Sequence, residues 1–284
     1  MDLTRVLPRN PLETLVSQGF LFARLPKAIQ ESIRATFDAG FTFFREPVET
    51  KVKFGFEQDL GYRAFGDEYS VSPDYPDQLE SFSVSPRLLV PKVSVRLISA
   101  RVLYERMSAT FDLIEPIVEG LTTLLANEIS GRSLDHPLSG KLRYWSRLQL
   151  NYTRPANVDL PFINETHEDL DLFTLTTASA AGLEVKRAED HFIPVDTSLA
   201  EAIIFPGEIA WLLSGGKLKP QYHRVRTYPK ISERISMLFF ADPEPTSCQP
   251  WILSNTNRGI DIPARVRRNV SRFGLKGFTD ELNG

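Results

Sequence analysis

Three side chains in the second half of the sequence could together hold a divalent metal ion. His167 and Asp169 lie two positions apart in the segment THEDL. In an extended segment, residues i and i+2 face the same side, so both could reach one ion while Glu168 points away. His223 would supply the third ligand from a later strand. Two imidazoles and one carboxylate make a facial triad that leaves coordination positions open, which is typical of oxygen-activating iron(II) sites.

The other two of the four histidines are weaker candidates. His191 follows two acidic residues, a cluster that favours a turn, and His136 precedes a proline, as in a loop. Taken alone, a His-x-Asp pair is more often a hydrogen-bonded surface or core histidine than a metal site. The metal assignment therefore depends on the residues that follow His223.

Arg234 and Ser236 follow on the next predicted strand and could bind a carboxylate. In a strand their side chains share one face. A guanidinium offers paired donors to a carboxylate, and the serine hydroxyl adds another. Each charged hydrogen bond of this kind contributes about 1.5–3 kcal/mol. The pair predicts a bound small-molecule acid whose other end reaches the metal.

Together these motifs resemble those of the iron(II)/2-oxoglutarate dioxygenases of the isopenicillin N synthase-like family. The shared pattern is His167-x-Asp169, a distal His223, and Arg234-x-Ser236. Other segments are similar to the family as well, including its N-terminal strand, the strand after the first metal motif and the approach to the distal histidine: residues 17–24, 182–185, 205–208 and 216–219.

The resemblance implies a mainly β fold with flanking helices, built on a double-stranded β-helix (jelly roll) with the metal at one open end. It implies that His167, Asp169 and His223 bind iron(II). It also implies that Arg234 and Ser236 hold the C5 carboxylate of 2-oxoglutarate, with O2 as the second cosubstrate. The expected enzyme is a dioxygenase that decarboxylates 2-oxoglutarate to succinate while it oxidises an unactivated C–H bond. Hydroxylation is the oxidation that we expect. Its substrate would be a small molecule, such as an amino-acid-derived or natural-product intermediate.

Asn151 is a further candidate for the cosubstrate site, because it resembles the asparagine of the family's Asn-Tyr strand. Relatives often carry a tyrosine two places later, where this chain has Thr153. Tyr152 would face the other way, so the usual tyrosine contact is in doubt and either residue could replace it. A structural role for Asn151 at a strand edge is an equally good interpretation.

Hydrophobic periodicity predicts a mixed first part followed by strands. Residues 17–25 suit a strand, and apolar residues at four-residue steps from Ile29 to Phe41 predict a helix. A longer helical stripe runs from Leu103 to Leu125 around Pro116. From about Lys141 the pattern changes to short β-rich runs at residues 142–152, 172–178, 182–186, 202–205, 223–227 and 235–240.

These elements suggest one integrated catalytic domain with three parts. Residues 1–140 would form a helical and mixed part that includes a substrate-lining segment. Residues 141–245 would form the jelly-roll core, and residues 246–284 a helical lid segment. Closure of residues 251–278 over the pocket would exclude water from the reaction.

Residues 61–86 are rich in proline, aromatic and charged residues, which indicates an ordered irregular segment. The segment matches the place where the family contributes substrate-pocket residues, so Tyr62, Arg63, Glu80 and Phe82 are candidates for substrate contacts. The alternative is that Arg63 and Glu80 form surface ion pairs while the two aromatics belong to the core. If both charges line the pocket, a zwitterionic or polar substrate would suit it.

Composition restricts the partners and the compartment. The net charge of −3 and pI of about 5.9 give no electrostatic footprint for nucleic acid. The single cysteine, Cys248, rules out an internal disulfide and suits a reducing compartment. No stretch has the apolar core of a signal peptide or a membrane span. We expect a cytoplasmic enzyme for a small molecule without nucleic-acid or membrane partners; a monomer is expected and an oligomer stays open.

Two other functions stay open. The iron site could serve an oxidase, oxidative cyclase or desaturase that does not use 2-oxoglutarate, because Arg234 and Ser236 could bind another carboxylate. A non-catalytic jelly-roll sensor that binds the metal is the other alternative, although a pure binder does not need open coordination positions. The sequence leaves undetermined the substrate, its regio- and stereochemistry, and the choice between hydroxylation, desaturation and cyclisation.

Overall fold

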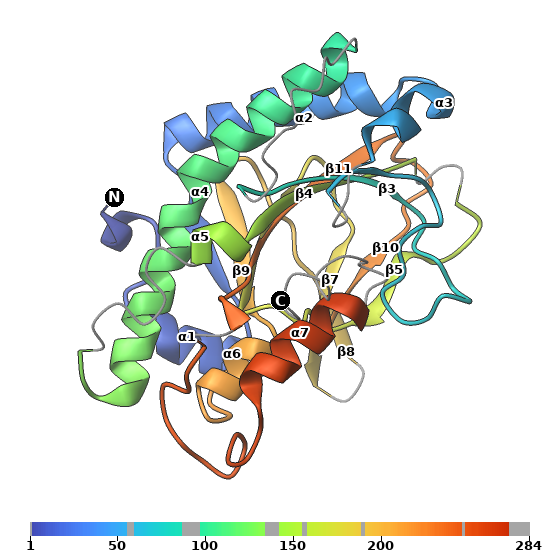
Figure 1. The fold of residues 1–284 in the computed structure, drawn as a ribbon. Helices are drawn as coiled ribbons and strands as arrows, with labels where there is room; N and C mark the ends of the chain where they lie inside the picture. Colours follow the sequence, from blue (N-terminus) through green and yellow to red (C-terminus); the bar gives the residue numbers. More distant parts are fainter. Residues whose placement is uncertain are drawn as a thin grey trace, which may run out of the picture.

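A computed structural model describes residues 2–55, 60–86, 97–133, 142–154, 158–188, 191–245 and 248–272. Within these residues the strands form two antiparallel sheets with helices on the outside (Figure 1). The larger sheet has the order β1-β9-β6-β11-β4-β3-β2, and the smaller sheet has the order β5-β10-β7-β8. This arrangement confirms the expected class, mainly β with flanking helices.

The strands of the two sheets alternate along much of the chain. The larger sheet contains β1 (Leu21–Arg24), β2 (Gly61–Arg63), β3 (Glu80–Val84), β4 (Arg147–Thr153), β6 (Phe173–Ala178), β9 (Glu201–Pro206) and β11 (Arg234–Ala241). The smaller sheet contains β5 (Phe162–His167), β7 (Leu183–Ala188), β8 (His191–Pro194) and β10 (His223–Arg226). Because the chain crosses repeatedly between the sheets from β4 to β11, it winds as a double-stranded β-helix.

The helices mostly cover the outside of the larger sheet. They are α1 (Pro11–Gln18), α2 (Lys27–Phe44), α3 (Val48–Lys51), α4 (Ile98–Ser130), α5 (Leu142–Trp145), α6 (Glu208–Leu213) and α7 (Ile262–Arg272), with 3-10 turns η1 (Leu3–Arg5) and η2 (Val52–Phe54). Helix α4 continues through Pro116. None of the helices in the described ranges is long and apolar enough to cross a membrane.

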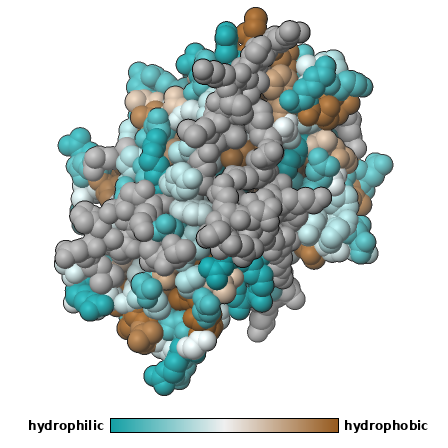
Figure 2. Space-filling view, viewed as in Figure 1, coloured by the Kyte–Doolittle hydropathy of each residue, from teal (hydrophilic) through white to brown (hydrophobic). Residues whose placement is uncertain are grey.

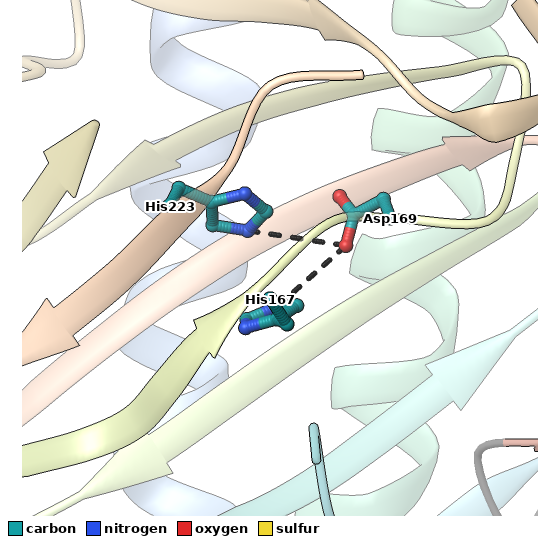
Figure 3. Close-up of side chains that lie close together, drawn as sticks. All are labelled: His167, Asp169 and His223. Atoms are coloured by element: carbon teal, nitrogen blue, oxygen red, sulfur yellow. Dashed lines mark ion pairs between the residues drawn. The ribbon is translucent and has the colours of Figure 1, made fainter. Parts of the chain in front are cut away.

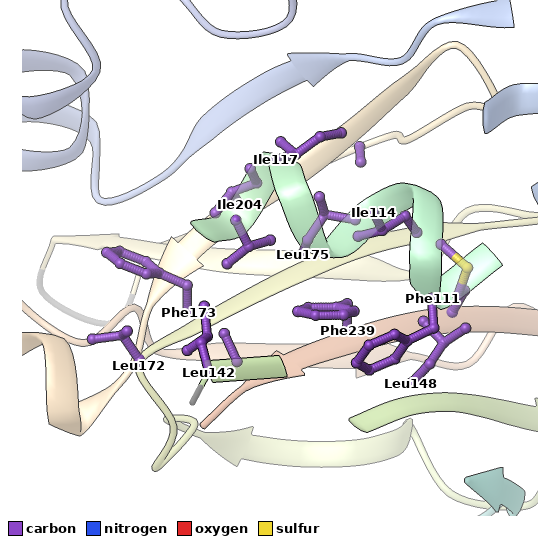
Figure 4. Packing of buried hydrophobic residues seen from close by; sticks show 14 of the residues in the cluster. Phe111, Ile114, Ile117, Leu142, Leu148, Leu172, Phe173, Leu175, Ile204 and Phe239 are labelled. Carbon is purple, nitrogen blue, oxygen red and sulfur yellow. The ribbon is translucent and has the colours of Figure 1, made fainter. Parts of the chain in front are cut away.

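The main core lies between α2, α4 and the larger sheet. Figure 4 shows Phe111 and Ile114 of α4 beside Phe239 of β11, and all three are at most 2% exposed. The rings of Phe111 and Phe239 have centroids 5.0 Å apart. Side chains that alternate with Phe239 on β11 face the other way, toward the smaller sheet. The face drawn in Figure 2 mixes hydrophilic and hydrophobic side chains wherever it is not grey.

Several sequence predictions need correction. Residues 61–86 are not wholly irregular, because β2 and β3 extend the edge of the larger sheet. The prolines and charged residues between these short strands obscured the alternation of polar and apolar residues from which a strand is predicted. His191 is not in a turn but begins β8, an exposed edge strand with little apolar signal, and β5 was not predicted. The run 142–152 begins with the helical turn α5, and residues 17–18 end α1. His136 lies outside the described residues.

A charged cluster around Glu233 connects the start of β11 with the end of α2. Arg45 donates from Nε to Glu233 Oε1 at 3.0 Å and also contacts Oε2. The Tyr152 hydroxyl donates to Oε1 at 2.6 Å, and Arg154 Nε lies 3.8 Å from the same atom. The hydrogen bond from Arg45 is the main cause that lowers the pKa of Glu233 to about 2.

The low pKa of Glu233 predicts how stability depends on pH. Because it is below the ordinary value of 4.5, ionised Glu233 stabilises the fold above pH about 5, and this contribution is lost as the pH falls toward about 2. Glu233→Gln should therefore lower the free energy of unfolding at pH 7, and its difference from wild type should shrink at pH 3. Denaturant unfolding at both pH values measures this. Glu49→Gln on α3, an exposed control, should change little, and a Glu233→Gln effect as large at pH 3 as at pH 7 would contradict the prediction.

Candidate metal and cosubstrate site

His167, Asp169 and His223 converge between the two sheets (Figure 3). One ligand atom from each lies within 4.8 Å of the others. Nε2 of His167 is 3.7 Å, and Nε2 of His223 is 3.9 Å, from Oδ1 of Asp169. Bonds from such ligand atoms to a first-row divalent metal measure about 2.0–2.2 Å. The spacing therefore suits one shared ion, as the sequence predicts.

Strand pairing places the two histidines side by side. β5 and β10 are antiparallel, with His167 directly opposite His223. Nδ1 of His167 is 2.7 Å from the Glu165 carbonyl oxygen, and Nδ1 of His223 is 3.0 Å from the Gln221 carbonyl oxygen. An Nδ1–H that donates to a carbonyl leaves Nε2 without a proton, which is the state that binds a metal. Both rings thus fit a metal on the Asp169 side.

Burial keeps His223 neutral. The residue is 4% exposed, and the Phe205 ring packs against its imidazole with centroids 4.6 Å apart. Burial, followed by the nearby His167, lowers the pKa of His223 to about 4. Since a metal binds the neutral imidazole, protonation of His223 does not compete with metal binding near pH 7.

The turn between β9 and α6 holds the backbone of the Asp169 loop. The Glu208 amide donates to the Asp169 carbonyl at 2.9 Å, and the Ile209 amide donates to the Asp171 carbonyl at 3.0 Å. A Cβ at Gly207 would lie only 2.4 Å from the Asp171 carbonyl oxygen and 2.8 Å from that of Asp169. The Thr174 hydroxyl donates to Oδ2 of Asp169. The close approach at Gly207 therefore fixes the position of the carboxylate.

Arg234 and Ser236 lie in the cavity that contains the three metal candidates. Arg234 is 4% exposed; its Nη1 donates to Ser236 Oγ at 3.1 Å, and its Nε contacts the Ala180 and Ala181 carbonyl oxygens at 3.3 and 3.2 Å. Burial lowers the pKa of Arg234 to about 10, so it is charged at pH 7. No acid in the described part of the chain forms an ion pair with it. A buried unpaired cation is costly, which indicates an anionic ligand.

Asn151 also lines the cavity, opposite Ser236 in the β4–β11 pairing. Its Oδ1 accepts a hydrogen bond from Gln149 Nε2 at 2.7 Å. Thr153 donates to the Gln78 carbonyl at 2.7 Å, and Tyr152 stacks on Phe44 on the opposite face of β4. Neither Thr153 nor Tyr152 lines the cavity.

None of the four expected substrate residues lines the cavity, although Arg63 contacts two residues that do. Tyr62 and Phe82 are buried core residues, and Glu80 pairs with Lys51 and accepts from the Tyr62 hydroxyl at 2.6 Å. The alternation of β3 explains the positions of Glu80 and Phe82, which face Lys51 of α3 and Phe43 of α2, whereas Ser81 and Ser83 face the other side. Arg63 contacts Glu68 at 3.1 Å and Gln149 at 2.9 Å, so it supports two cavity residues without lining the cavity itself.

Other residues line the cavity wall away from Arg234. They were not predicted from the sequence, and they are Glu68, Tyr69, Ser70, Asp77, Arg147, Gln149, Asn164 and Phe240. Arg147 and Gln149 share the face of β4 that carries Asn151, so two-residue periodicity could have identified them. The cavity residues in the loop between β2 and β3 follow no sequence period, so periodicity could not have identified them. No residue in the range 248–268, where the structure describes the side chains, lines the cavity.

Residues 144–243 match the 2OG-Fe(II) oxygenase superfamily. The chain is 27% identical to a bi-functional coumaroyl CoA and feruloyl CoA ortho-hydroxylase of Ipomoea batatas, over 89% of this chain and 71% of that protein. It is also 35% identical to a 2-oxoglutarate-dependent dioxygenase of Arabidopsis thaliana over 80 residues. This stretch is 28% of this chain and 18% of that protein.

Solved structures share the fold. A full-length protein of Neurospora crassa, crystallised in complex with alpha-KG, superimposes with a TM-score of 0.75 at 19% identity, covering 92% of this chain and 89% of that chain. A putative 2OG-Fe(II) oxygenase family protein of Caulobacter crescentus gives a TM-score of 0.73 at 19% identity, covering 95% and 94%. These similarities confirm the expected jelly-roll fold.

Removal of Asp169 tests the metal site. Loss of a group that only supports a ligand costs about 10–100-fold in metal affinity, so Asp169→Ala should cost more than that. Equilibrium dialysis with iron(II) or cobalt(II) measures the affinity. Glu168→Ala, which removes the neighbouring acid, should bind metal as wild type does. Equal losses in both variants would remove Asp169 from the site.

Gly207→Ala tests the turn that holds Asp169. The added Cβ must displace the Asp169 loop, so metal affinity should fall by about 10–100-fold, as for the loss of a supporting group. Circular dichroism should show the fold retained. Gly259→Ala is the control for a destabilising glycine substitution outside the site: its Cβ meets nothing within 4 Å, although its φ of 77° strains an alanine, and it should keep its metal affinity. Wild-type affinity in Gly207→Ala would show that the loop does not depend on this contact.

Family match, fold and site geometry agree. The superfamily match spans β4 to β11, the strands that surround the cavity. The cavity brings together two histidines, one aspartate and a buried arginine without an acidic partner among the described residues. Iron(II) and 2-oxoglutarate are the metal and cosubstrate of this class. Residues 144–243 therefore match the 2OG-Fe(II) oxygenase superfamily, and this match and the similarity to hydroxylases and dioxygenases support an oxidoreductase of the dioxygenase class.

Proposed function

We propose that this enzyme hydroxylates an unactivated C–H bond of a small molecule, with His167, Asp169 and His223 as iron ligands and Arg234 and Ser236 as the 2-oxoglutarate clamp. The observation that carries the proposal is that the three ligand candidates share one cavity with a buried, unpaired guanidinium. An iron oxidase that does not use 2-oxoglutarate would leave this cation without a partner unless its substrate supplied one.

The residues of the site have separate tasks in this proposal. His167, Asp169 and His223 would hold iron(II), and a set of three protein ligands would leave coordination positions for other ligands. Arg234 donates to the distal carboxylate of 2-oxoglutarate, and Ser236 adds a hydroxyl beside it. Iron(II) with 2-oxoglutarate and O2 supplies the oxidising chemistry: one oxygen atom enters the substrate as a hydroxyl, the other enters succinate, and CO2 leaves.

Apolar side chains surround the part of the cavity near the ligand candidates. They are Leu183, Phe205, Val225 and Leu238. They exclude water and lower the local dielectric constant, which strengthens charge interactions with the cosubstrate. Ser70, Asp77 and Asn164 make another part of the cavity wall polar. A polar small molecule, such as an amino-acid-derived or natural-product intermediate, is the substrate class that this wall favours.

Coupled product formation tests the function. Protein with iron(II), 2-oxoglutarate and O2 is incubated with a panel of small metabolites, and succinate and CO2 are measured together with hydroxylated product. A true substrate should give succinate, CO2 and product in equal amounts. Substrate oxidation without loss of 2-oxoglutarate would favour the oxidase, cyclase or desaturase. Oxygen consumption that never exceeds one equivalent per protein would favour the sensor.

Arg234→Gln tests the clamp. Loss of one charged hydrogen bond of about 1.5–3 kcal/mol corresponds to about 10–100-fold, so KM for 2-oxoglutarate should rise by about that factor. Iron affinity should stay the same, because the guanidinium does not contact the metal candidates. Arg226→Gln, which removes an arginine paired with Glu184 outside the cavity, is the matched control. An unchanged KM for 2-oxoglutarate in Arg234→Gln would refute the role of Arg234.

A further inference from the structure

A second arginine, Arg147, lines the same cavity at a distance from Arg234. On β4 it lies opposite Phe240 of β11, whereas Arg234 of β11 lies opposite Thr153. Arg234 and Phe240 are six residues apart on one strand, which corresponds to about 20 Å along β11. The cavity thus has a guanidinium toward each end, and the metal candidates project into it from the smaller sheet and the Asp169 loop.

The protein satisfies little of the hydrogen-bonding capacity of Arg147. Its side chain is 14% exposed, and its guanidinium carbon lies 4.4 Å from the centroid of the Phe240 ring. Nη1 lies 3.4 Å from Oδ2 of Asp242, which is at the long limit of a hydrogen bond. Nε is buried and has no hydrogen-bond partner among the described residues. The buried Asp171 also interacts electrostatically with Arg147, without a hydrogen bond to it. A guanidinium has five N–H donors, so these two acids leave most of them unused.

Other polar residues that line the cavity contact one another instead. Gln149 donates to Asn151 Oδ1 at 2.7 Å and to Glu68 Oε2 at 3.2 Å. Ser70 donates to Asp77 Oδ2 at 2.7 Å. Arg147 is therefore the residue of this wall with a buried donor to spare, and leaving such a charged donor without a partner is unfavourable.

We propose that Arg147 binds a carboxylate of the substrate, so that the enzyme acts on small organic acids. This inference rests on the proposed function and names its substrate class. Phe240 packs against the guanidinium, and the terminal nitrogens supply donors that a carboxylate accepts. A phosphate fits less well, because Glu68 and Asp77 in the same wall would repel its second negative charge. The two arginines then hold two different acids, the cosubstrate at Arg234 and the substrate at Arg147.

Arginine side-chain NMR tests this independently of turnover. The Nε–H resonance of Arg147, identified by its loss in Arg147→Lys, is followed in protein saturated with zinc(II) and 2-oxoglutarate. Acetate, butanoate and benzoate are added, then their carboxamides, then inorganic phosphate. At least one carboxylate should shift the resonance saturably while its carboxamide does not. Asp242→Asn, which removes the neighbouring acid and keeps Arg147, should retain the shift.

The possible outcomes separate the two proposals. No shift with any carboxylate, or equal shifts with the carboxamides, overturns the role of Arg147, and a shift with phosphate alone overturns the substrate class. The same titration without zinc(II) and 2-oxoglutarate can be made even if the protein produces no succinate. A carboxylate-specific shift without any succinate formation would therefore leave the acid site standing and refute the proposed function.

Turnover provides a second test for every acid that stimulates succinate formation. Arg147→Met should raise KM for that acid by about 10–100-fold, as expected for the loss of a charged hydrogen bond. KM for 2-oxoglutarate should not change. An equal rise in both constants would place Arg147 at the cosubstrate and overturn the inference.

Discussion

The antiparallel pairing of β5 with β10 is the constraint on which the site depends. It places His167 directly opposite His223, so the two imidazoles leave the smaller sheet at the same level. Asp169 follows two residues after His167, and the turn at Gly207 holds its backbone by two main-chain hydrogen bonds to the Asp169–Asp171 segment. A shift of one residue in this pairing would send one imidazole to the outer face, because side chains alternate along a strand.

The two faces of the larger sheet have different tasks: one packs against helices in the core, and the other lines the cavity. On β4, Leu148, Leu150 and Tyr152 are buried toward α2 and α4, whereas Arg147, Gln149 and Asn151 face the cavity. The helix-covered face can therefore pack tightly with apolar side chains. The cavity face can carry a buried charged group, such as Arg234, that lacks a partner of opposite charge among the described residues. Burial of such groups costs free energy, and a bound anion offsets that cost.

Much of the fold could be predicted from local patterns. Helices α2 and α4 follow from apolar residues at three- and four-residue spacing, and most core strands follow from their β-rich runs. The predictions failed for short edge strands, such as β8 at His191, where neither face is deeply buried and the alternation of polar and apolar residues is weak. They also failed for residues 61–86, where two short strands lie between turns, β2 pairing with β3 and β3 with β4.

The sequence by itself determined the residues able to bind a metal and an acid, because His-x-Asp, a distal histidine and Arg-x-Ser carry the required donor atoms at strand spacing. Tertiary structure decided which other residues share their cavity. Tyr62 of β2 and Phe82 of β3 pack against Phe43 of α2, and Glu80 pairs with Lys51 of α3. Their direction depends on how β2 pairs with β3 and β3 with β4. Arg147 came to the cavity for the same reason, since pairing with β11 turned its side of β4 inward. Residue types define possible chemistry, but strand register decides which face meets the ligand.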